Sequence, residues 1–462
     1  MSALGFIALL TALPVMDGNV ASAAPGAPGE MAAPTVVLYE GFESPLPPTT
    51  SEFVQTIADY DSGGPASAPG YVGEGGQRYA ADDAWNGRFC NGLIVTGEDP
   101  ATLPTAQTAA DCQQSGWNQS LSLASTLGLW AADPEYPYPL TPTGTPGQNH
   151  AVTAYTQGDV PPGVMASTVV PAITGNFYTA TVDVAQANCW TTNPVSLSLQ
   201  LSDGVSTPTA VFPGPISACA LPVHQFNGNN VGTFIGVNPY RAESASVVLA
   251  LVNELGGGGG DDNAFDNLAV LDITPQLDAV FMPAPSGSAY TSMESARLVF
   301  TITNTHLAGS PQIPSGAKPE WSFVLTLPDG LVVAGEPHVE TTCAESSLSS
   351  SGSSITGAGS LGITDVSCTL SVDVTSAGGE YTLTPSMFTS SGLLAPAETS
   401  IAFTPRPAAD PSGAPNGALA ASGVDVRVWL TIGAVTTGAG LLVLAADTRA
   451  RRRARMTSAG QR

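Results

Sequence analysis

Short segments in which apolar residues occupy every second position recur along the chain. Residues 298–303, 321–327 and 368–374 alternate most clearly, and residues 177–184 and 195–201 largely do so. Successive side chains of a β-strand point to opposite faces, so each segment would bury one face and leave the other in water. The 50 Gly, the 39 Pro and the 11% of charged residues argue against a mostly helical chain. The sequence therefore predicts an all-β fold.

The β-like segments fall into two groups, which predict two domains. Residues 34–274 contain short segments separated by Gly, Pro and Asn turns, as in an antiparallel β-sandwich. Residues 275–404 alternate at higher contrast and have the size of an immunoglobulin-like (Ig-like) sandwich. The β signal is poor between Ser44 and Thr174, where we expect long loops at one end of the first domain. Residues 405–418, rich in Pro, Ala and Gly, predict a spacer.

Both ends of the chain predict export. An apolar run and the small residues Ala21, Ser22 and Ala23 indicate a signal peptide over residues 1–23, with a buried N-terminal helix as the alternative. Residues 428–446 contain no charge, and at about 1.5 Å per residue a helix there would span roughly 28 Å, close to the thickness of a hydrocarbon core. The Arg-rich tail that follows would stay in the cytoplasm before any processing, which leaves the rest of the chain outside.

A small-residue pentapeptide precedes this apolar span: Leu419, Ala420, Ala421, Ser422 and Gly423. The order of pentapeptide, apolar helix and Arg cluster resembles the cell-wall sorting signal of Gram-positive surface proteins, in the Leu-Ala-x-Thr-Gly variant used in actinobacteria. The resemblance implies that residues 419–462 are a sorting signal, that a membrane sortase cuts after the fourth residue, and that the chain is then linked to the envelope. Ser422 stands where that family has Thr. The alternative is a simple C-terminal membrane anchor.

Two further stretches resemble the modules of such proteins. Residues 262–278, 298–305 and 321–331 are similar to the junction and start of the Ig-like repeat modules (the DUF11-like group) of actinobacterial wall-anchored proteins. Residues 149–155 and 176–184 are similar to their N-terminal jelly-roll-like domain. The resemblance implies a jelly-roll-like or lectin-like β-sandwich over residues 34–274, followed by the Ig-like domain.

The charge balance and the histidines limit the function. Thirteen Lys and Arg against 38 Asp and Glu give a net charge of −25, which excludes nucleic acid as a partner because Lys and Arg carry phosphate binding. We find no hydrolase signature around His150, His224, His306 or His338, and no carboxylate pattern of jelly-roll glucanases. We therefore expect no enzymatic activity.

Carboxylates near both ends of the first domain predict a cation site. Glu40 and Glu43 lie near its start, and Asp261, Asp262 and Asp266 precede its last segment. The carbohydrate-binding jelly rolls that this domain resembles pair their first and last strands and hold a structural Ca²⁺ between such carboxylates, and Ca²⁺ takes six to eight oxygen ligands. We expect a structural Ca²⁺ on Glu40, Glu43, Asp262 and Asp266, with acids that only solvate loop ends as the alternative.

Six cysteines, none in a Cys-x-x-Cys pair, suit an oxidising compartment. Sequence proximity favours the disulfides Cys90–Cys112, Cys189–Cys219 and Cys343–Cys368, although crossed pairing among the first four cysteines remains open. Lys318 is the only lysine, so we expect disulfides rather than Lys–Asn isopeptide bonds to stiffen the domains.

Aromatic residues gather in or near the loop-rich part of the first domain: Trp85, Trp117, Trp130, Tyr136, Tyr138 and Trp190. They could form a platform on which sugars stack, or they could pack in the core. We expect a non-catalytic cell-surface protein, anchored to the Gram-positive envelope, whose N-terminal sandwich binds a glycan or protein ligand on an Ig-like spacer. A purely structural envelope component is the alternative, and a wall-associated glycan hydrolase is the least favoured one.

Overall fold

The structure is a computed structural model that describes residues 27–44, 54–60, 69–103, 112–137, 145–155, 160–189, 195–220, 224–258, 262–284 and 289–405. The predicted signal peptide, the pentapeptide 419–423, the apolar span 428–446 and the Arg-rich tail lie outside these ranges, as does the spacer beyond residue 405. Within the ranges, no helix is long and apolar enough to cross a membrane.

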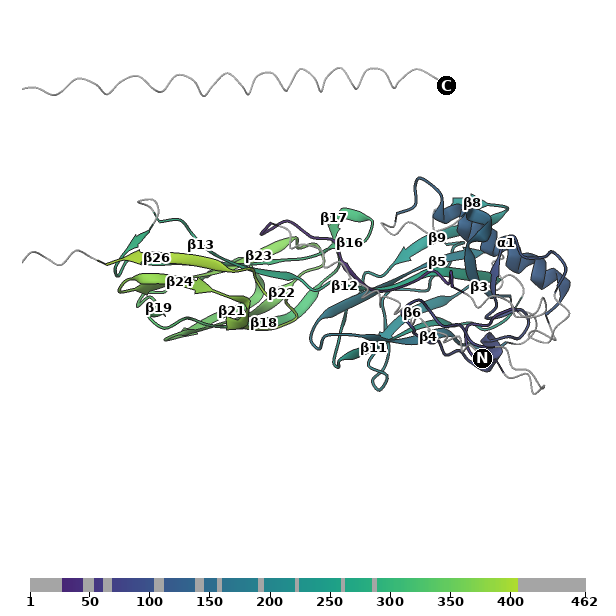
Figure 1. Ribbon diagram of the computed structural model, residues 1–462, viewed down its shortest axis with the longest axis horizontal. Coiled ribbons are helices and arrows are strands. Elements are labelled where there is room, and N and C mark those ends of the chain that lie inside the picture. The colour runs from purple at the N-terminus through teal and green to yellow at the C-terminus, as the bar shows by residue number, and fades with distance from the viewer. Residues whose placement is uncertain are drawn as a thin grey trace, which may run out of the picture. The chain divides into compact units, whose positions relative to one another are not determined.

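The described chain is built almost entirely of β-strands, as the alternating segments predicted (Figure 1). We call residues 35–272 the head and residues 276–404 the C-terminal sandwich. The larger head sheet contains, in spatial order, β2 (Ile94–Thr96), β3 (His150–Ala154), β12 (Asn263–Asp272), β5 (Phe177–Gln186), β9 (Asn229–Ile235) and β8 (His224–Phe226), with β1 (Thr35–Glu40) also paired to β12 and β10 (Tyr240–Arg241) to β5. The smaller sheet contains β4 (Gly163–Pro171), β11 (Ser246–Asn253), β6 (Leu197–Ser202) and β7 (Thr209–Ala210).

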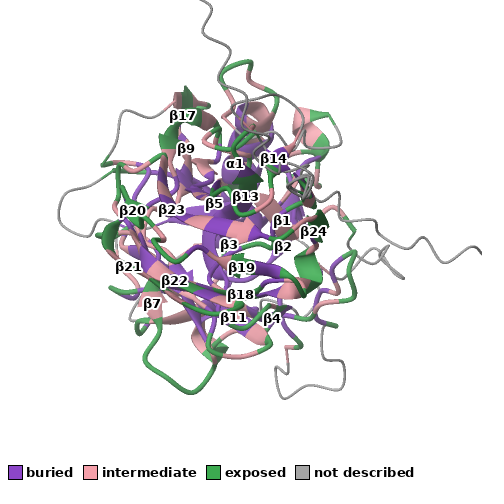
Figure 2. Cartoon of the chain, turned by 90° about the vertical axis from the view of Figure 1, so that its left-hand side faces the viewer, coloured by how far each residue is buried: buried purple, intermediate pink, exposed green. Residues whose placement is uncertain are grey.

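The two head sheets pack face to face. Val182 and Val184 of β5 share one apolar core with Leu199 of β6 and Leu249 of β11, and all four side chains are 0% exposed. The first and last strands of the head are neighbours, as the resemblance to jelly rolls implied, because β1 runs antiparallel to β12. In an end-on view, buried residues fill the interior of the sheets and exposed residues lie mostly in the connections (Figure 2).

One α-helix, α1 (Gln114–Ala131), covers the outer face of the larger head sheet (Figure 1). Its apolar residues Trp117, Leu121, Ala124 and Leu127 recur at helical spacing and pack against small side chains of the sheet, such as Ala185. We predicted long loops in this region, which was wrong for residues 114–131. The many Ser, Gln and Gly residues of the segment obscured the apolar stripe. The head also contains the short 3₁₀-helices η1 (Asp83–Trp85) and η3 (Pro146–Gln148).

The C-terminal sandwich has two main sheets. One contains β13 (Gln276–Phe281), β15 (Ala296–Thr303), β23 (Ser367–Ser376) and β19 (Leu331–Val333), with β20 (Glu340–Thr341) on β23. The other contains β21 (Ala344–Ser351), β22 (Ser354–Leu361), β18 (Lys318–Thr326) and β25 (Phe388–Ser391). Smaller sheets join β14 (Tyr290–Thr291), β26 (Thr399–Thr404) and β24 (Gly379–Leu383), and pair β16 (His306–Leu307) with β17 (Ser310–Pro314); η4 (Pro385–Met387) precedes β25.

The alternating residues of the C-terminal sandwich form its core. Leu298, Phe300 and Ile302 of β15 are 0% exposed, and so is Trp321 of β18. Three disulfides stiffen the molecule, and each joins the cysteines that proximity favoured: Cys90–Cys112, Cys189–Cys219 and Cys343–Cys368.

Candidate functional site

Two carboxylates face each other on the outer side of the larger head sheet. Asp183 of β5 and Asp266 of β12 are cross-strand partners, and both are 0% exposed. Burial raises the pKa of Asp183 to about 6. Burial, with the negative charges of Asp183 and Glu43 nearby, raises the pKa of Asp266 well above its usual value. This pair could not be predicted from the sequence, because Asp183 occupies a position of the alternating pattern that predicts a water-facing side chain.

Neutral donors surround Asp183. Its carboxylate accepts hydrogen bonds from the hydroxyls of Tyr136 (2.8 Å) and Thr233 (2.5 Å) and from Nδ2 of Asn267 (2.7 Å). Trp130, at the end of α1, donates from Nε1 to the Thr233 hydroxyl (3.0 Å). The helix and the segment after it therefore seal the carboxylate from solvent.

A β-bulge shapes the surroundings of Asp266. The register of β12 against β5 shifts between Asp266 and Ala269, and Asn267 adopts a φ of 50°, in the left-handed region that Asn tolerates. The backbone N–H of Asn267 donates to Asp266 Oδ1 (2.6 Å), and Asn149 Nδ2 donates to Asp266 Oδ2 (2.9 Å). Asp266 is thus held by protein donors.

The predicted Ca²⁺ ligands have different surroundings, and the Ca²⁺ site stays a prediction. Glu40 lies in its own buried pocket and accepts four hydrogen bonds, from the backbone N–H of Phe42, the hydroxyls of Tyr71 and Tyr79, and the amide of Gln77. These four donors satisfy the Glu40 carboxylate without a cation.

The other predicted ligands have protein contacts of their own. Glu43 contacts the backbone N–H and Nδ1 of His150, each at 3.0 Å. Asp262 is buried just before β12, where its backbone carbonyl accepts a hydrogen bond from the N–H of Ala187. Asp261 lies outside the described residues.

A different set of metal-ligating groups meets on the head. Three residues, Asp133, Glu135 and His224, each offer one ligand atom, and these atoms lie within 4.8 Å of one another. The His224 ring stacks on Trp130 with 4.2 Å between ring centroids, which fixes its position. Two carboxylates and an imidazole are a chemically suitable set for a transition-metal ion. The sequence offered no signal for this group, because His224 is distant along the chain and no regular spacing links it to the acids.

The tryptophans of the proposed glycan platform belong to the interior. Trp85, Trp117 and Trp130 are 1%, 1% and 3% exposed, so their ring faces are not open to a sugar. Tyr136 is half-buried, and Tyr138 and Trp190 lie outside the described residues. For these three tryptophans the structure shows core packing.

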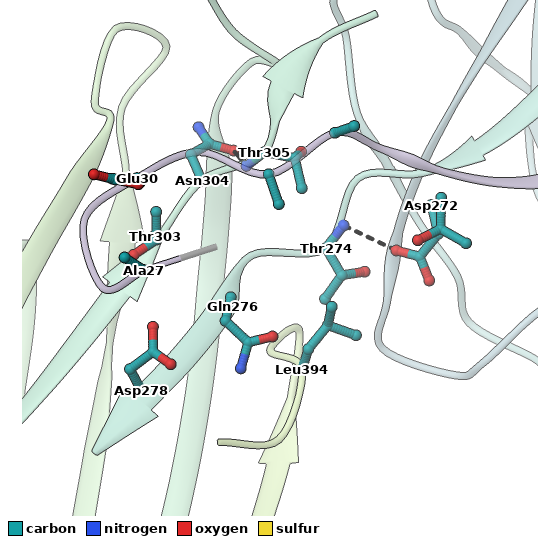
Figure 3. Close-up of a pocket in the computed structure, with 13 residues that line it drawn as sticks. Ala27, Glu30, Asp272, Thr274, Gln276, Asp278, Thr303, Asn304, Thr305 and Leu394 are labelled. Carbon is teal, nitrogen blue, oxygen red and sulfur yellow. Dashed lines mark hydrogen bonds between the residues drawn. The ribbon is translucent and has the colours of Figure 1, made fainter. Parts of the chain in front are cut away.

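A cavity of about 190 Å³ opens beside the segment that connects β12 to β13 (Figure 3). Its lining comes from the N-terminal segment 27–35, residues 272–278, the end of β15 at 303–305, and Leu394. Three carboxylates contribute to it, those of Glu30, Asp272 and Asp278. We call it the junction cavity.

Asp278 is the unusual member of this lining. It is 8% exposed, and its Oδ2 is buried without a hydrogen-bond partner in the described structure. Burial raises its pKa to about 6. On β13, Leu277 and Ala279 point into the apolar core, so Asp278 points to the other face, which the sequence alone would assign to water. In the view of Figure 3, Asp278 and Asp272 lie at opposite ends of the lining, with Gln276 and Thr274 between them.

Comparison with known proteins assigns part of the chain. Residues 275–402, nearly all of the C-terminal sandwich, match a family model described as "Domain of unknown function (DUF7933)". The resemblance to the DUF11-like group stays a prediction. No curated protein matches the chain.

Two solved structures are similar at low identity. The N-terminal domain of the Streptococcus gordonii adhesin Sgo0707 matches at 8% identity with a TM-score of 0.25, over 55% of this chain and 61% of that one. The collagen binding domain of the Erysipelothrix rhusiopathiae surface protein RspB matches at 8% identity with a TM-score of 0.16, over 55% of this chain and 96% of that one.

Proposed function

We propose that the protein is an exported, non-catalytic binding protein of the cell surface that takes its ligand at the junction cavity. The observation that carries this proposal is the cavity of about 190 Å³, whose lining includes three acids, one of them the buried Asp278. A polar group buried without a partner costs about 1 to 3 kcal/mol, and more when it is charged. A ligand in the cavity that turned the Asp278 carboxyl toward itself and donated a hydrogen bond would remove that cost for Oδ2.

The disulfides support export. The structure contains three disulfides, and such bonds persist mainly in oxidising compartments outside the cytoplasm. Export through the signal peptide 1–23 and covalent anchoring by a sortase at Ser422 complete the proposal. If boiling detergent extracts the whole protein from intact cells with its C-terminal tail present, sortase anchoring is wrong and a membrane tether remains.

The burial of Asp183 and Asp266 supports a non-catalytic role. Asp183 and Asp266 have the raised pKa values that general acids use, yet both are 0% exposed and are held by neutral donors of the protein. An external substrate would have to displace α1 or the segment after it to reach Asp183. These acids therefore suit a structural role under the helix better than acid–base chemistry.

Arrays of glycans and peptides would test the proposed function. The chain would be collected after export, together with Asp278→Asn and with Asp329→Asn as an equal change of charge at an exposed position elsewhere. We expect retention on one class of ligand, at least tenfold weaker for Asp278→Asn and unchanged for Asp329→Asn. If no ligand is retained, or if both variants bind like the wild type, the alternative of a purely structural envelope component is favoured.

A further inference from the structure

Two acids and a histidine converge on the head at a place that shares no residue with the junction cavity. We propose that Asp133, Glu135 and His224 bind a divalent transition-metal ion, with Zn²⁺ as its representative, and that the ion fastens the turn after α1 to strand β8. This site is separate from the proposed ligand cavity and does not depend on it.

The two acids are held by the turn that follows α1. The backbone N–H of Asp133 donates to the carbonyl of Trp130 at 2.9 Å, and the N–H of Tyr136 donates to the carbonyl of Asp133 at 3.0 Å. The N–H of Glu135 donates to Asp133 Oδ1 at 2.8 Å. These bonds fix the backbone from which both carboxylates project, so little order would have to be gained on binding an ion.

His224 is positioned by a strand and by a ring contact. It is the first residue of β8 and the cross-strand partner of Val231 on β9, and its ring stacks on Trp130 with 29° between the ring planes. Its Nε2 lies 3.8 Å from Glu135 Oε2. This separation is too long for a hydrogen bond, but two ligands that each bind one zinc ion at about 2.1 Å can lie up to about 4.2 Å apart. The spacing therefore fits an ion shared by the two side chains.

The end of α1 gives an independent reason to expect a cation. The carbonyl groups at the C-terminus of a helix carry a partial negative charge, which basic side chains in the last turn offset. Helix α1 has no basic residue in its last turn, and Asp133 and Glu135 follow it directly. In the described part of the chain, His224 is the only basic side chain that pairs with either acid. A divalent cation would neutralise both carboxylates and the end of the helix.

The types of ligand select the kind of ion. An imidazole nitrogen with carboxylate oxygens suits zinc and its neighbours among the transition metals, whereas Ca²⁺ takes six to eight oxygen ligands. Three protein ligands leave the fourth position of a tetrahedral zinc ion to water. The side chain of Glu135 is 77% exposed, so ions can reach the site from solvent.

An ion at this site would tighten the cover over Asp183. Tyr136, which follows Glu135, donates from its hydroxyl to Asp183 Oδ2 at 2.8 Å. Fastening the turn 133–136 to β8 would therefore also hold Tyr136 on the buried carboxylate. We expect the amides of residues 132–136 and 224–226 to exchange with solvent more slowly when the ion is bound.

The test is a calorimetric titration of zinc chloride into the exported chain, produced without a histidine tag and freed of metal by EDTA that is then removed. His224→Gln and Glu135→Gln remove one ligand each. His306→Gln is a matched control, because His306 Nδ1 contacts the backbone carbonyl of Leu307, and Asp329→Asn changes an exposed acid elsewhere. The melting temperature of each metal-free variant checks its folding.

We expect one Zn²⁺ per chain with a micromolar Kd, at least tenfold weaker binding by both ligand variants, and wild-type binding by both controls. Ca²⁺ should bind more weakly than Zn²⁺. Hydrogen exchange should slow at residues 132–136 and 224–226 in the wild type and not in His224→Gln.

No binding of Zn²⁺, unchanged binding by a folded His224→Gln or Glu135→Gln variant, or tighter binding of Ca²⁺ would overturn the proposal. Binding that weakens as much in His306→Gln or Asp329→Asn would show an adventitious ion only. Binding without slower exchange at residues 132–136 would overturn the fastening of the turn to β8. None of these outcomes bears on the junction cavity, whose test uses Asp278→Asn.

Discussion

The only lysine of the chain is buried at a position where the sequence predicts a turn. Lys318 lies in a Gly- and Pro-flanked segment that reads as a turn, yet it is the first residue of β18 and is 0% exposed. Its Nζ donates to Asn304 Oδ1 and to the backbone carbonyls of Ser315 and Gly316. Burial lowers the pKa of Lys318 to about 7, against the opposing influence of the negative charge of Asp272.

Lys318→Met should change how stability depends on pH. Between pH 7 and 10 the unfolded chain holds the Lys318 proton and the folded chain does not, so unfolding takes up a proton and the free energy of unfolding rises with pH. From pH 7 to 9 this contribution amounts to about 2 kcal/mol. Urea unfolding at both pH values would measure it. The wild type should gain about 2 kcal/mol more than Lys318→Met over this range; an equal gain in both proteins would show that Lys318 keeps its proton when folded.

At the scale of elements, the buried acids of β5 and β12 form a cross-strand pair of like charges. A carboxyl group whose folded pKa is raised binds more protons when folded, so stability falls as the pH rises through the window between its unfolded and folded pKa values. For Asp183 that window runs from about 4 to about 6.

Asp266→Asn should relieve part of this loss. The Asn oxygen can accept from the backbone N–H of Asn267, and the Asn149 amide can turn to meet the new NH₂ group. Removing one charge of a cross-strand pair should stabilise the protein by about 1 kcal/mol at pH 8 relative to pH 4. Unfolding of the wild type and the variant at both pH values checks this. A variant that loses stability equally at pH 4 and pH 8 would show that the hydrogen bonds of Asp266, rather than its charge, decide.

The seating of α1 depends on Gly128. A Cβ at Gly128 would lie 2.0 Å from the carbonyl oxygen of Pro146, whereas a Cβ at Gly335 would meet nothing within 4 Å. Alanine favours a helix over glycine by about 1 kcal/mol, but overpacking costs about 1 to 3 kcal/mol. The clash should therefore lower the free energy of unfolding on balance. Gly128→Ala should lower the melting temperature, and Gly335→Ala should leave it within error. Equal melting temperatures would mean that α1 can shift away from η3 without cost.

These elements show what the sequence could predict. The strands of the C-terminal sandwich were predictable because apolar residues such as Leu298, Phe300 and Ile302 repeat with the period of a strand that has one solvent-exposed face. The burial of Asp183 and Asp278 could not be predicted. Each occupies a polar position of an alternating strand, but in the fold it faces a second layer, which is α1 for Asp183 and the N-terminal segment for Asp278. Periodicity predicts two faces of a strand, and it does not reveal when distant parts of the chain cover both.

At the scale of the whole molecule, the apolar interior is divided. The main core of the head and the core of the C-terminal sandwich share no residue, and a small cluster around Ile273 and Ala308 lies between them. Arg241 adds a polar link there, because its Nη2 donates to Ser391 Oγ at 2.8 Å. Separate apolar cores suit two sandwiches that unfold in separate steps.

The disulfides offer a direct test of this division. Cys343 and Cys368 both belong to the core of the C-terminal sandwich and are 25 residues apart, whereas Cys90 and Cys112 lie beside α1 in the head. Closing a loop of this length disfavours the unfolded chain by about 3 to 4 kcal/mol. Changing Cys343 and Cys368 to Ala should therefore lower the melting temperature of the C-terminal sandwich and leave that of the head in place. Changing Cys90 and Cys112 should do the reverse. Differential scanning calorimetry would resolve the two transitions, and a single transition that both variants shift alike would show that the two sandwiches unfold as one cooperative unit.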